Sequence, residues 1–319
     1  MSIKKTLAGF VIATLASAAS AAWPDDKPIR IVVPYPAGGF GDVVMRDMAD
    51  RLRPTLGTMI VENRTGAAGN IGMEVVARAA PDGHTFVFGG GNNFVTNQYI
   101  YRSMRFDPTR MRAVTVLCEV PSVVFVNTDS NVRQMADLVE FSQKRPGRVF
   151  YGSPGIGSLQ HLSGEAISQT MSLGMTHVPF KGAPEAILAL LANDVQMVVV
   201  GASLGINHVR TGKLRAIAVS GNERAPMLPD TPTLAEANLG AIKSGSWWPF
   251  AAPEGTPNDI IARMYTLIRD NMGSPSGREF LASQGSVPIL STPEATTRRI
   301  TEESDYWKAR LSQWKITLD

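Results

Sequence analysis

The chain has 319 residues, of which 44% are hydrophobic and 18% are charged, and its formal net charge is +3. These values are typical of a globular protein that is long enough for two domains. No basic stripe is interleaved with aromatic residues, so we expect no nucleic-acid partner. Cys118 is the only cysteine, which excludes an internal disulfide and any mechanism that needs a cysteine pair.

The first 21 residues have the pattern of a secretory signal peptide. Lys4 and Lys5 precede an apolar run at residues 7–15, and Ala19-Ser20-Ala21 provides an A-x-A cleavage site. A membrane-spanning helix needs about 20 apolar residues, and no later segment has them. We therefore expect cleavage after Ala21, a mature protein in the periplasm, and a formal charge that falls from +3 to +1 with the loss of both lysines.

The first predicted unit of the mature chain is a strand, a glycine-rich loop and a helix. Ile29–Val33 is an apolar, β-branched run that predicts a buried strand, and prolines and glycines at 34–41 end it. Asp42 is a suitable N-cap, and apolar residues recur every fourth position behind it. Glycines let a ligand approach the backbone, and free N–H groups of a first helical turn favour an anion. The alternative is a sharp turn between two packed elements.

Further strands are predicted at residues 59–61, 85–89, 114–117 and 123–126, with a helix over 71–80. The first two of these strands are followed by polar, glycine-bearing segments, 62–69 and 89–93. Ligands of open α/β sheets bind at the carboxyl ends of strands, where such segments gather.

The second half of the chain repeats the pattern of strand, glycine loop and helix. A short strand from residue 149 is followed by Ser153-Pro154-Gly155-Ile156-Gly157, and Ser158 is placed to cap the next helix. Two such loops suggest two halves that face each other across a cleft. Neither loop fits a nucleotide motif, because there is no G-x-x-x-x-G-K-[ST] and no third glycine of a Rossmann fingerprint.

The remaining elements are predicted from the same signals. Strands are expected at 195–200, 213–220 and 287–290, and helices at 134–144 and from Pro184 through Leu191. The segment 223–233, which has three prolines, is expected to cross back to the first half. The aromatic run Ser246-Trp247-Trp248-Pro249-Phe250 follows, and the chain beyond residue 257 is expected to be mostly helical.

Several stretches together resemble the periplasmic solute receptors of tripartite tricarboxylate transporters, also called Bug receptors. They cover nearly the whole mature chain in order and spacing, so the set is specific although each stretch alone is weak. The matching stretches are Pro34-Tyr35-Pro36-Ala37-Gly38-Gly39 with Asp42, Val61-Glu62-Asn63-Arg64 with Gly66-Ala67-Ala68-Gly69, Pro81-Asp82-Gly83, Gly152-Ser153-Pro154-Gly155-Ile156-Gly157-Ser158 with His161-Leu162, His177-Val178-Pro179-Phe180-Lys181-Gly182, Gly212-Lys213-Leu214-Arg215-Ala216, Leu228-Pro229-Asp230-Thr231-Pro232-Thr233 with Glu236, and Ala252-Pro253 with Gly255-Thr256-Pro257.

The resemblance implies a two-lobed Venus-flytrap fold of the periplasmic-binding-protein type II kind, with an α/β sheet in each lobe and two hinge crossings. We expect lobe 1 to contain residues 22–122 and 227–319, and lobe 2 to contain residues 123–226. The implied function is to capture a small carboxylate between the lobes and to deliver it to the membrane permease of a tripartite tricarboxylate transporter. We expect a monomer without cofactor or metal.

Carried over residue by residue, the resemblance also implies which residues bind the ligand. The first loop contributes Tyr35, Ala37, Gly38, Gly39, Phe40, Gly41 and Asp42; the segment after the third strand contributes Asn92, Asn93 and Asn97; the second loop contributes Ser153, Gly155, Gly157, Ser158 and His161; and Gly201, Ala202 and Trp247 complete the set.

The chain departs from the family pattern at three places. Gly41 stands where a hydroxyl residue is common, Phe40 is bulkier than usual, and Val200 and Gly201 replace a polar or acidic residue. An ammonium group would find no carboxylate partner there. We therefore favour a di- or tricarboxylate or an aromatic carboxylate over an amino acid.

Other roles compete at several of these positions. Asp42 and Ser158 are also suited to capping their helices, and a hydrogen-bonded structural role is favoured for His161. Trp247 and Trp248 either line the cleft or pack between the lobes. A hydrolase using Ser158 and His161 is a rival hypothesis, although no G-x-S-x-G elbow is present. A sensor that presents its liganded form to a membrane protein is another.

Overall fold

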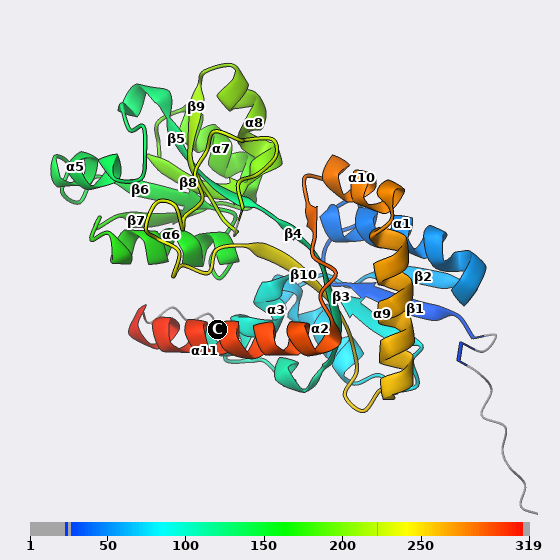
Figure 1. The fold of residues 1–319 in the computed structure, drawn as a ribbon. Helices are drawn as coiled ribbons and strands as arrows, with labels where there is room; N and C mark the ends of the chain where they lie inside the picture. Colours follow the sequence, from blue (N-terminus) through cyan, green and yellow to red (C-terminus); the bar gives the residue numbers. More distant parts are fainter. Residues whose placement is uncertain (1–22, 25–26, 222, 315–319) are drawn as a thin grey trace, which may run out of the picture.

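The computed structural model describes residues 23–24, 27–221 and 223–314, and it has two α/β lobes (Figure 1). This confirms the predicted two-lobed fold. The expected signal peptide lies outside the described residues. None of the helices in the described ranges is long and apolar enough to cross a membrane.

The first lobe is built on a six-stranded sheet with the order β11-β4-β10-β3-β1-β2. β1 runs parallel to β2 and β3, whereas β10 runs antiparallel to β3 and β4. The strands are β1 (Ile29–Val33), β2 (Met59–Asn63), β3 (Thr85–Phe88), β4 (Arg112–Val120), β10 (Ser246–Ala252) and β11 (Val287–Pro288).

The second lobe is built on a five-stranded sheet with the order β7-β6-β8-β5-β9. β6 runs parallel to β7 and β8, whereas β5 runs antiparallel to β8 and β9. The strands are β5 (Ser122–Asn127), β6 (Phe150–Ser153), β7 (Thr176–Pro179), β8 (Met197–Gly201) and β9 (Leu214–Val219).

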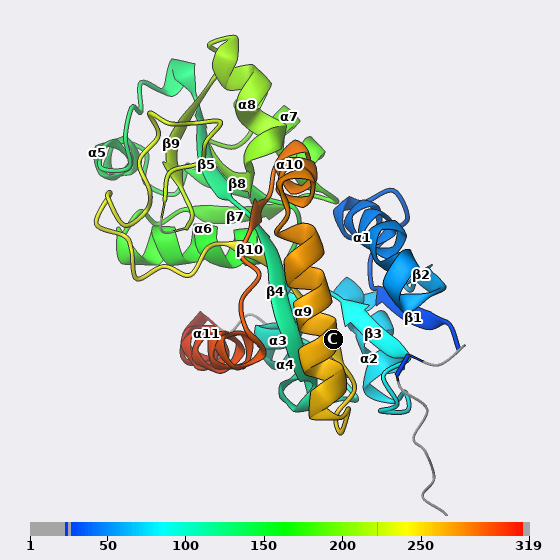
Figure 2. The same cartoon turned by 45° about the vertical axis from the view of Figure 1, so that its right-hand side comes forward.

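Helices cover the faces of both sheets (Figures 1 and 2). Those of the first lobe are α1 (Phe40–Leu56), α2 (Asn70–Ala77), α3 (Gly91–Val95), α4 (Asn97–Ile100), α9 (Asn258–Met272), α10 (Pro275–Ser283) and α11 (Pro293–Trp314). Those of the second lobe are α5 (Asp137–Gln143), α6 (Leu159–Thr170), α7 (Ala183–Leu191) and α8 (Ala202–Arg210). Short 3-10 turns occur at Ala67–Gly69, Pro108–Arg110 and Thr128–Ser130.

The two sheets share one strand arrangement. β1, β2 and β3 in the first lobe take the places that β6, β7 and β8 take in the second. The strand that arrives from the other lobe, β10 or β5, then lies antiparallel beside β3 or β8. The glycine loops after β1 and β6 therefore occupy equivalent positions in the two lobes.

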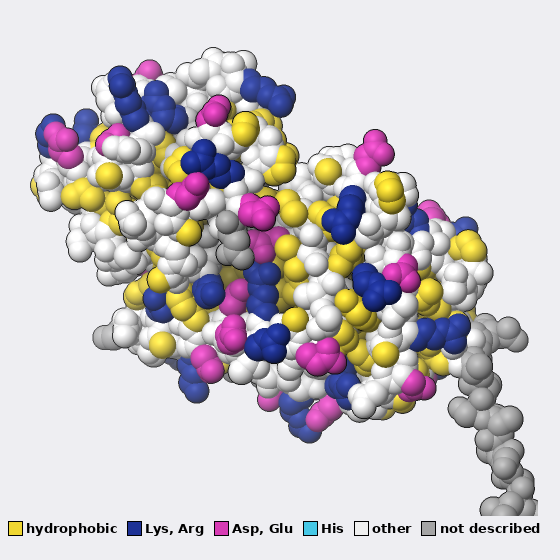
Figure 3. Space-filling model, in the orientation of Figure 1, with side chains coloured by type: hydrophobic (Ala, Val, Ile, Leu, Met, Phe, Trp, Pro, Cys, Tyr) yellow, Lys and Arg dark blue, Asp and Glu magenta, His cyan; other side chains and the backbone are white. Residues whose placement is uncertain are grey.

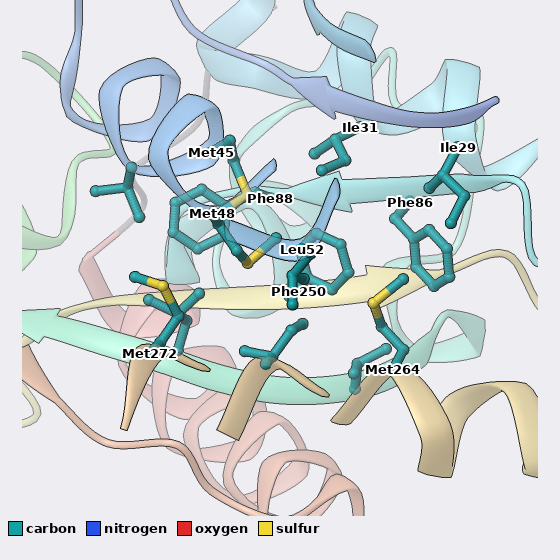
Figure 4. Close-up of a cluster of buried hydrophobic side chains, with 14 of the residues drawn as sticks. Ile29, Ile31, Met45, Met48, Leu52, Phe86, Phe88, Phe250, Met264 and Met272 are labelled. Atoms are coloured by element: carbon teal, nitrogen blue, oxygen red, sulfur yellow. The ribbon is translucent and has the colours of Figure 1, made fainter. Parts of the chain in front are cut away.

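The core of the first lobe lies between the sheet and helices α1 and α9 (Figure 4). Its apolar residues are fully buried because strand side chains on this face meet the apolar stripes of both helices. The labelled members are Ile29 and Ile31 of β1, Phe86 and Phe88 of β3, Phe250 of β10, Met45, Met48 and Leu52 of α1, and Met264 and Met272 of α9.

Two crossings connect the lobes, and the second lies later than the sequence predicted. The first is Pro121, between β4 and β5. The segment 223–233 does not cross back, because Leu228, Leu234 and Ile242 pack into clusters of the second lobe. The return occurs at residues 243–245, immediately before β10. The prolines resemble a linker in composition, but the leucines between them are buried side chains.

The sequence predicted only an aromatic run where the structure has the strand β10, which contains Pro249 in its middle. Proline cannot donate to a strand ladder, and within sheets it is confined to edges and bulges. Here β10 is a central strand, and its register against β4 shifts between Trp248 and Pro249. The bulge places the proline where the ladder is already interrupted.

Candidate functional site

The first glycine loop ends at α1, where Gly39 rather than Asp42 is the N-cap. Asp42 lies one turn inside the helix, and its carboxylate accepts the Gly38 N–H at 2.9 Å. Arg46, one turn later, pairs with the same carboxylate at 2.9 Å. These hydrogen bonds, chiefly that from Arg46, hold the pKa of the buried Asp42 below its usual range. Asp42 therefore holds the loop in shape, and its negative charge is already paired with Arg46.

Tyr35 connects this loop to the segment after β3. Its hydroxyl lies 2.8 Å from Asn93 Oδ1 and 3.2 Å from Asn92 Oδ1, and it accepts the Gly90 N–H. Burial raises the pKa of Tyr35 to about 12, so the phenol is protonated and donates. The predicted site residues Tyr35, Asn92 and Asn93 are thus brought together.

Three asparagines of this segment also converge on one carbonyl, that of Ala68. The Nδ2 groups of Asn93, Asn97 and Asn92 lie 2.7, 3.2 and 3.5 Å from the oxygen. Ala67 and Ala68 have φ of +47° and +50°, a left-handed conformation that is unusual for alanine. The predicted set of ligand residues omitted this turn; the flanking Gly66 and Gly69 were the only signal for it.

Side chains in and beside the second glycine loop hydrogen bond to each other and to its backbone. Ser153 Oγ accepts the Gly155 N–H at 3.2 Å and lies 2.8 Å from His177 Nε2. Ser158 is the N-cap of α6, accepts the His161 N–H at 3.1 Å and donates to the Gly155 carbonyl at 2.8 Å. Both hydroxyls, which the sequence predicted to bind ligand directly, hydrogen bond within the loop and hold its shape.

His161 also stabilises the loop. Its Nδ1 accepts the Gly157 N–H at 3.1 Å, and its ring is buried. The side chains of Ser158 and His161 are not hydrogen bonded to each other, because the serine contacts the His161 backbone N–H. That geometry is not the one a nucleophile and its base require.

Backbone donors remain free at the starts of both helices. Within the described chain, the N–H groups of Phe40, Gly41 and Asp42 have no hydrogen-bond partner. The N–H groups of Ile156, Leu159 and Gln160 likewise have none among the described residues. Such groups, with the positive end of a helix dipole behind them, attract anions.

The second loop lies directly against the first lobe. A Cβ added to Gly157 would be 3.4 Å from Ile100 of α4. Leu159 and Leu162, in the first two turns of α6, share an apolar cluster with Ile100. The second loop and the start of α6 therefore pack against α4 of the first lobe.

Trp248, and not Trp247, lies beside the first loop. The Trp248 ring packs against Phe40 and Tyr35, with centroids 4.9 and 5.3 Å apart, and a Cβ on Gly41 would come within 3.0 Å of it. Trp247 points to the opposite face of β10 and is 0% exposed, with Nε1 donating to Glu303 at 2.9 Å. The expected ligand contact of Trp247 is therefore wrong for this conformation.

The other predicted site residues have mixed surroundings. Ala37 and Gly38 are exposed, and Gly39 and Gly155 are half-buried. Gly201 is half-buried beside Val120, close to the first crossing, whereas Ala202 is fully buried and its N–H donates to the Pro121 carbonyl.

A separate cavity of about 630 Å³ lies where the two crossings meet. Its walls come from both lobes and include no residue of either glycine loop. Glu119, Arg299 and Glu303 form an ion-pair network on one wall, with N–O distances of 3.0 and 2.8 Å. Figure 3 shows acidic and basic side chains gathered where the lobes meet.

Residues 44–315 match the family described as tripartite tricarboxylate transporter family receptor. BugT of Bordetella pertussis is 30% identical over 304 residues, which cover 94% of this chain and 93% of that protein.

Two similar solved structures contain a dicarboxylate ligand. Rpa4515 of R. palustris, with adipate, is 32% identical with a TM-score of 0.77, over 91% of this chain and 97% of that one. MatC of Rhodopseudomonas palustris, with bound malate, is 26% identical with a TM-score of 0.73, over 88% of this chain and 98% of that one.

Proposed function

Because the chain belongs to the family of tripartite tricarboxylate transporter receptors, we propose that it captures a dicarboxylate between its lobes and delivers it to a membrane permease of that transporter class. The observation that supports this most directly is the pair of equivalent glycine loops, each with free N–H groups at the start of a helix. One carboxylate would be bound at α1 and the other at α6. The receptor acts in the periplasm as a monomer.

Neutral donors rather than cations meet the negative charge in this proposal. Neither loop contains Lys or Arg, and Arg46 behind the first loop is paired with Asp42. A hydrogen bond to a charged acceptor contributes about 1.5–3 kcal/mol. A few such bonds at each end are sufficient for micromolar affinity, which corresponds to about 8 kcal/mol.

The surroundings of the loops favour a plain dicarboxylate over an amino acid. The Asp42 carboxylate is already paired, so an ammonium group would find no free acid in either loop. Phe40 and Trp248 provide an apolar contact beside the first loop. Two relatives of known structure contain adipate and malate, both of which are dicarboxylates.

Calorimetric titration of the purified mature protein with adipate, malate, citrate, benzoate and glutamate tests the proposal. We expect saturable binding of at least one dicarboxylate, weaker binding of the others, and an unchanged ligand on recovery. A ligand at a hundred times its Kd should also add about 2.7 kcal/mol to the free energy of unfolding. Failure of every carboxylate to bind, or conversion of the ligand, would contradict the proposed function.

A further inference from the structure

Two histidines from different elements stack behind the second glycine loop. The rings of His161 on α6 and His177 on β7 have centroids 3.8 Å apart and planes inclined by 26°. The Tyr151 ring of β6 lies near both, with its centroid 5.0 Å from that of His177 and 6.4 Å from that of His161. Aromatic rings alone would explain a packed stack, but both imidazoles also hydrogen bond to the loop.

Each imidazole fixes a different part of the loop. His161 Nδ1 accepts the Gly157 N–H, so the neutral ring carries its proton on Nε2. His177 Nε2 lies 2.8 Å from Ser153 Oγ, which in turn accepts the Gly155 N–H. The free N–H group of Ile156 lies between these two anchored glycines.

Gly155 and Gly157 need this support because of their backbone conformations. Their φ values are +139° and +82°, which L side chains rarely adopt and which leave glycine a large choice of other conformations. Without its anchors, the loop would sample many states, and a ligand would have to order it on binding. Anchoring the loop beforehand removes that entropic cost.

The stack is built for neutral imidazoles. Burial and the neighbouring His177 lower the pKa of His161 to about 3. Burial lowers the pKa of His177 to about 4. The titratable groups that face the pair are Tyr151, whose hydroxyl donates to Glu165 at 2.8 Å, and Glu165 itself, one turn after His161. Within the described chain, neither group hydrogen bonds to an imidazole nitrogen, so a proton on the stack gains no carboxylate partner.

Protonation would remove the His161 anchor. A proton on Nδ1 occupies the lone pair that accepts the Gly157 N–H. The Nδ1–H and the Gly157 N–H are then two donors that point at each other. A second proton on His177 would place two cations in contact within the stack.

We propose that His161 and His177 are positioning residues that hold the second loop ready for a carboxylate and release it when the stack is protonated. The choice of ligand rests on the proposed function, whereas the anchoring of the loop by the two histidines does not. It assigns the pair no contact with the ligand. Adipate and malate are the probes.

The first test follows the loop without ligand. In NMR spectra, His161 should show the Nε2–H tautomer, and the Gly157 amide should be protected from hydrogen exchange. His161→Asn places an amide oxygen near the Nδ1 position and should keep the protection, whereas His161→Leu should lose it at least tenfold. Equal protection of Gly157 in wild type and His161→Leu would overturn the positioning role. His208→Gln, on the last turn of α8, is the control and should change nothing.

The second test measures binding against pH. The double variant His161→Asn/His177→Gln keeps an acceptor near each bonded nitrogen but cannot titrate. We expect it to bind the probe within about threefold of wild type at pH 7, the scale of a fraction of one hydrogen bond. Between pH 5 and 3 both proteins lose affinity as the ligand protonates, and wild type should lose at least tenfold more.

The outcomes separate the two proposals. Parallel pH profiles of wild type and the double variant would contradict release by protonation. If neither probe binds wild type at pH 7, the proposed function fails for these ligands, while the Gly157 amide still decides whether the histidines position the loop.

Discussion

Asp42, Ser153, Ser158 and His161 are four polar side chains that a reader of the sequence would assign to the ligand. In the structure each is buried or engaged in holding a glycine loop. The groups left without a partner in the described chain are backbone N–H groups at the starts of α1 and α6. At the scale of single residues, the polar side chains position the donors, and the backbone is left to bind.

Asp42→Asn tests the first of these roles. The variant loses the ion pair with Arg46 and should lower the free energy of unfolding by about 1–2 kcal/mol at pH 7. Because the pKa of Asp42 is lowered by folding, its contribution is present above the unfolded pKa and lost as pH falls through the folded one. Urea titrations at pH 7 and pH 3 should therefore show a difference that disappears in acid. Asp50→Asn, in an exposed pair on the same helix, should have little effect at either pH.

Gly157→Ala tests the contact between the second loop and the first lobe. An alanine at φ +82° costs about 1–2 kcal/mol from backbone strain, and its methyl would contact Ile100 of the first lobe at 3.4 Å. Gly147→Ala is a matched control, since φ is +70° and nothing lies within 4 Å of the added carbon. Both variants should lose stability in chemical denaturation, but only Gly157→Ala should weaken dicarboxylate binding in calorimetry. Equal binding by the two variants would argue against a loop seated at the site.

At the scale of elements, the starts of α1 and α6 are built differently for the same purpose. α1 begins at Gly39 without a side-chain cap, and Asp42 supports the loop from inside the helix. α6 begins with Ser158, whose hydroxyl satisfies the His161 N–H. Each arrangement uses one polar side chain and leaves three N–H groups of the loop and first turn without a partner in the described chain.

Ser158 variants distinguish capping from ligand contact. Ser158→Ala removes the cap and should cost about 1 kcal/mol of stability, with the affinity for a dicarboxylate changed less than tenfold. Ser158→Asp keeps an N-cap acceptor and should retain stability, yet its negative charge beside the anion should abolish binding. Thermal melts and calorimetry on the same samples give both values. A stable Ser158→Ala protein that cannot bind would show that the hydroxyl contacts the ligand after all.

At the scale of the whole molecule, one ionic network lies at the junction of the two lobes. Glu119 is two residues before Pro121, and Trp247 lies opposite it on β10. Arg299 of α11 pairs with Glu119 and Glu303 and lies 4.7 Å above the Trp247 ring. Gly245 leaves room for Glu119, because an added Cβ would be 2.0 Å from the carboxylate. The network therefore joins both crossings to the first lobe.

Arg299→Met should strongly destabilise the protein. It leaves two poorly exposed carboxylates without their cation, and breaking a buried pair in this way costs about 3 kcal/mol or more. Arg299→Lys should recover part of the lost stability, because lysine keeps the positive charge but lacks the planar guanidinium group that can hydrogen bond to two carboxylates. Guanidinium unfolding monitored by tryptophan fluorescence measures both. Arg110→Met removes an exposed pair with Glu254 and should leave the midpoint nearly unchanged.

Closure of the lobes is expected to accompany binding. The rotation would occur at Pro121 and at residues 243–245, the two short crossings, with few backbone dihedral changes. Small-angle X-ray scattering should therefore show a smaller radius of gyration in the presence of a saturating dicarboxylate. Ligand that binds in calorimetry without any compaction would indicate a receptor whose lobes are already closed.

The sequence by itself determined the family, the two-lobed α/β fold and the two glycine loops, because local patterns carry that information. Apolar runs that end in glycine predict strand ends, and Ile29–Val33 was predicted to the residue. Ser158 was also correctly placed as a helix cap. Such features depend on neighbours within a few positions, where the sequence is sufficient.

Only the tertiary structure decided which polar groups are free. His177 reaches Ser153 across two strands, Asn97 reaches Ala68 across 29 positions, and Trp247 and Trp248 face opposite sides of one strand. A bulge beside Pro249 allows a segment that contains proline to form a central strand. These outcomes depend on which residues meet across a sheet or between lobes, and hydrogen bonds formed there consume groups that appear available in the linear chain.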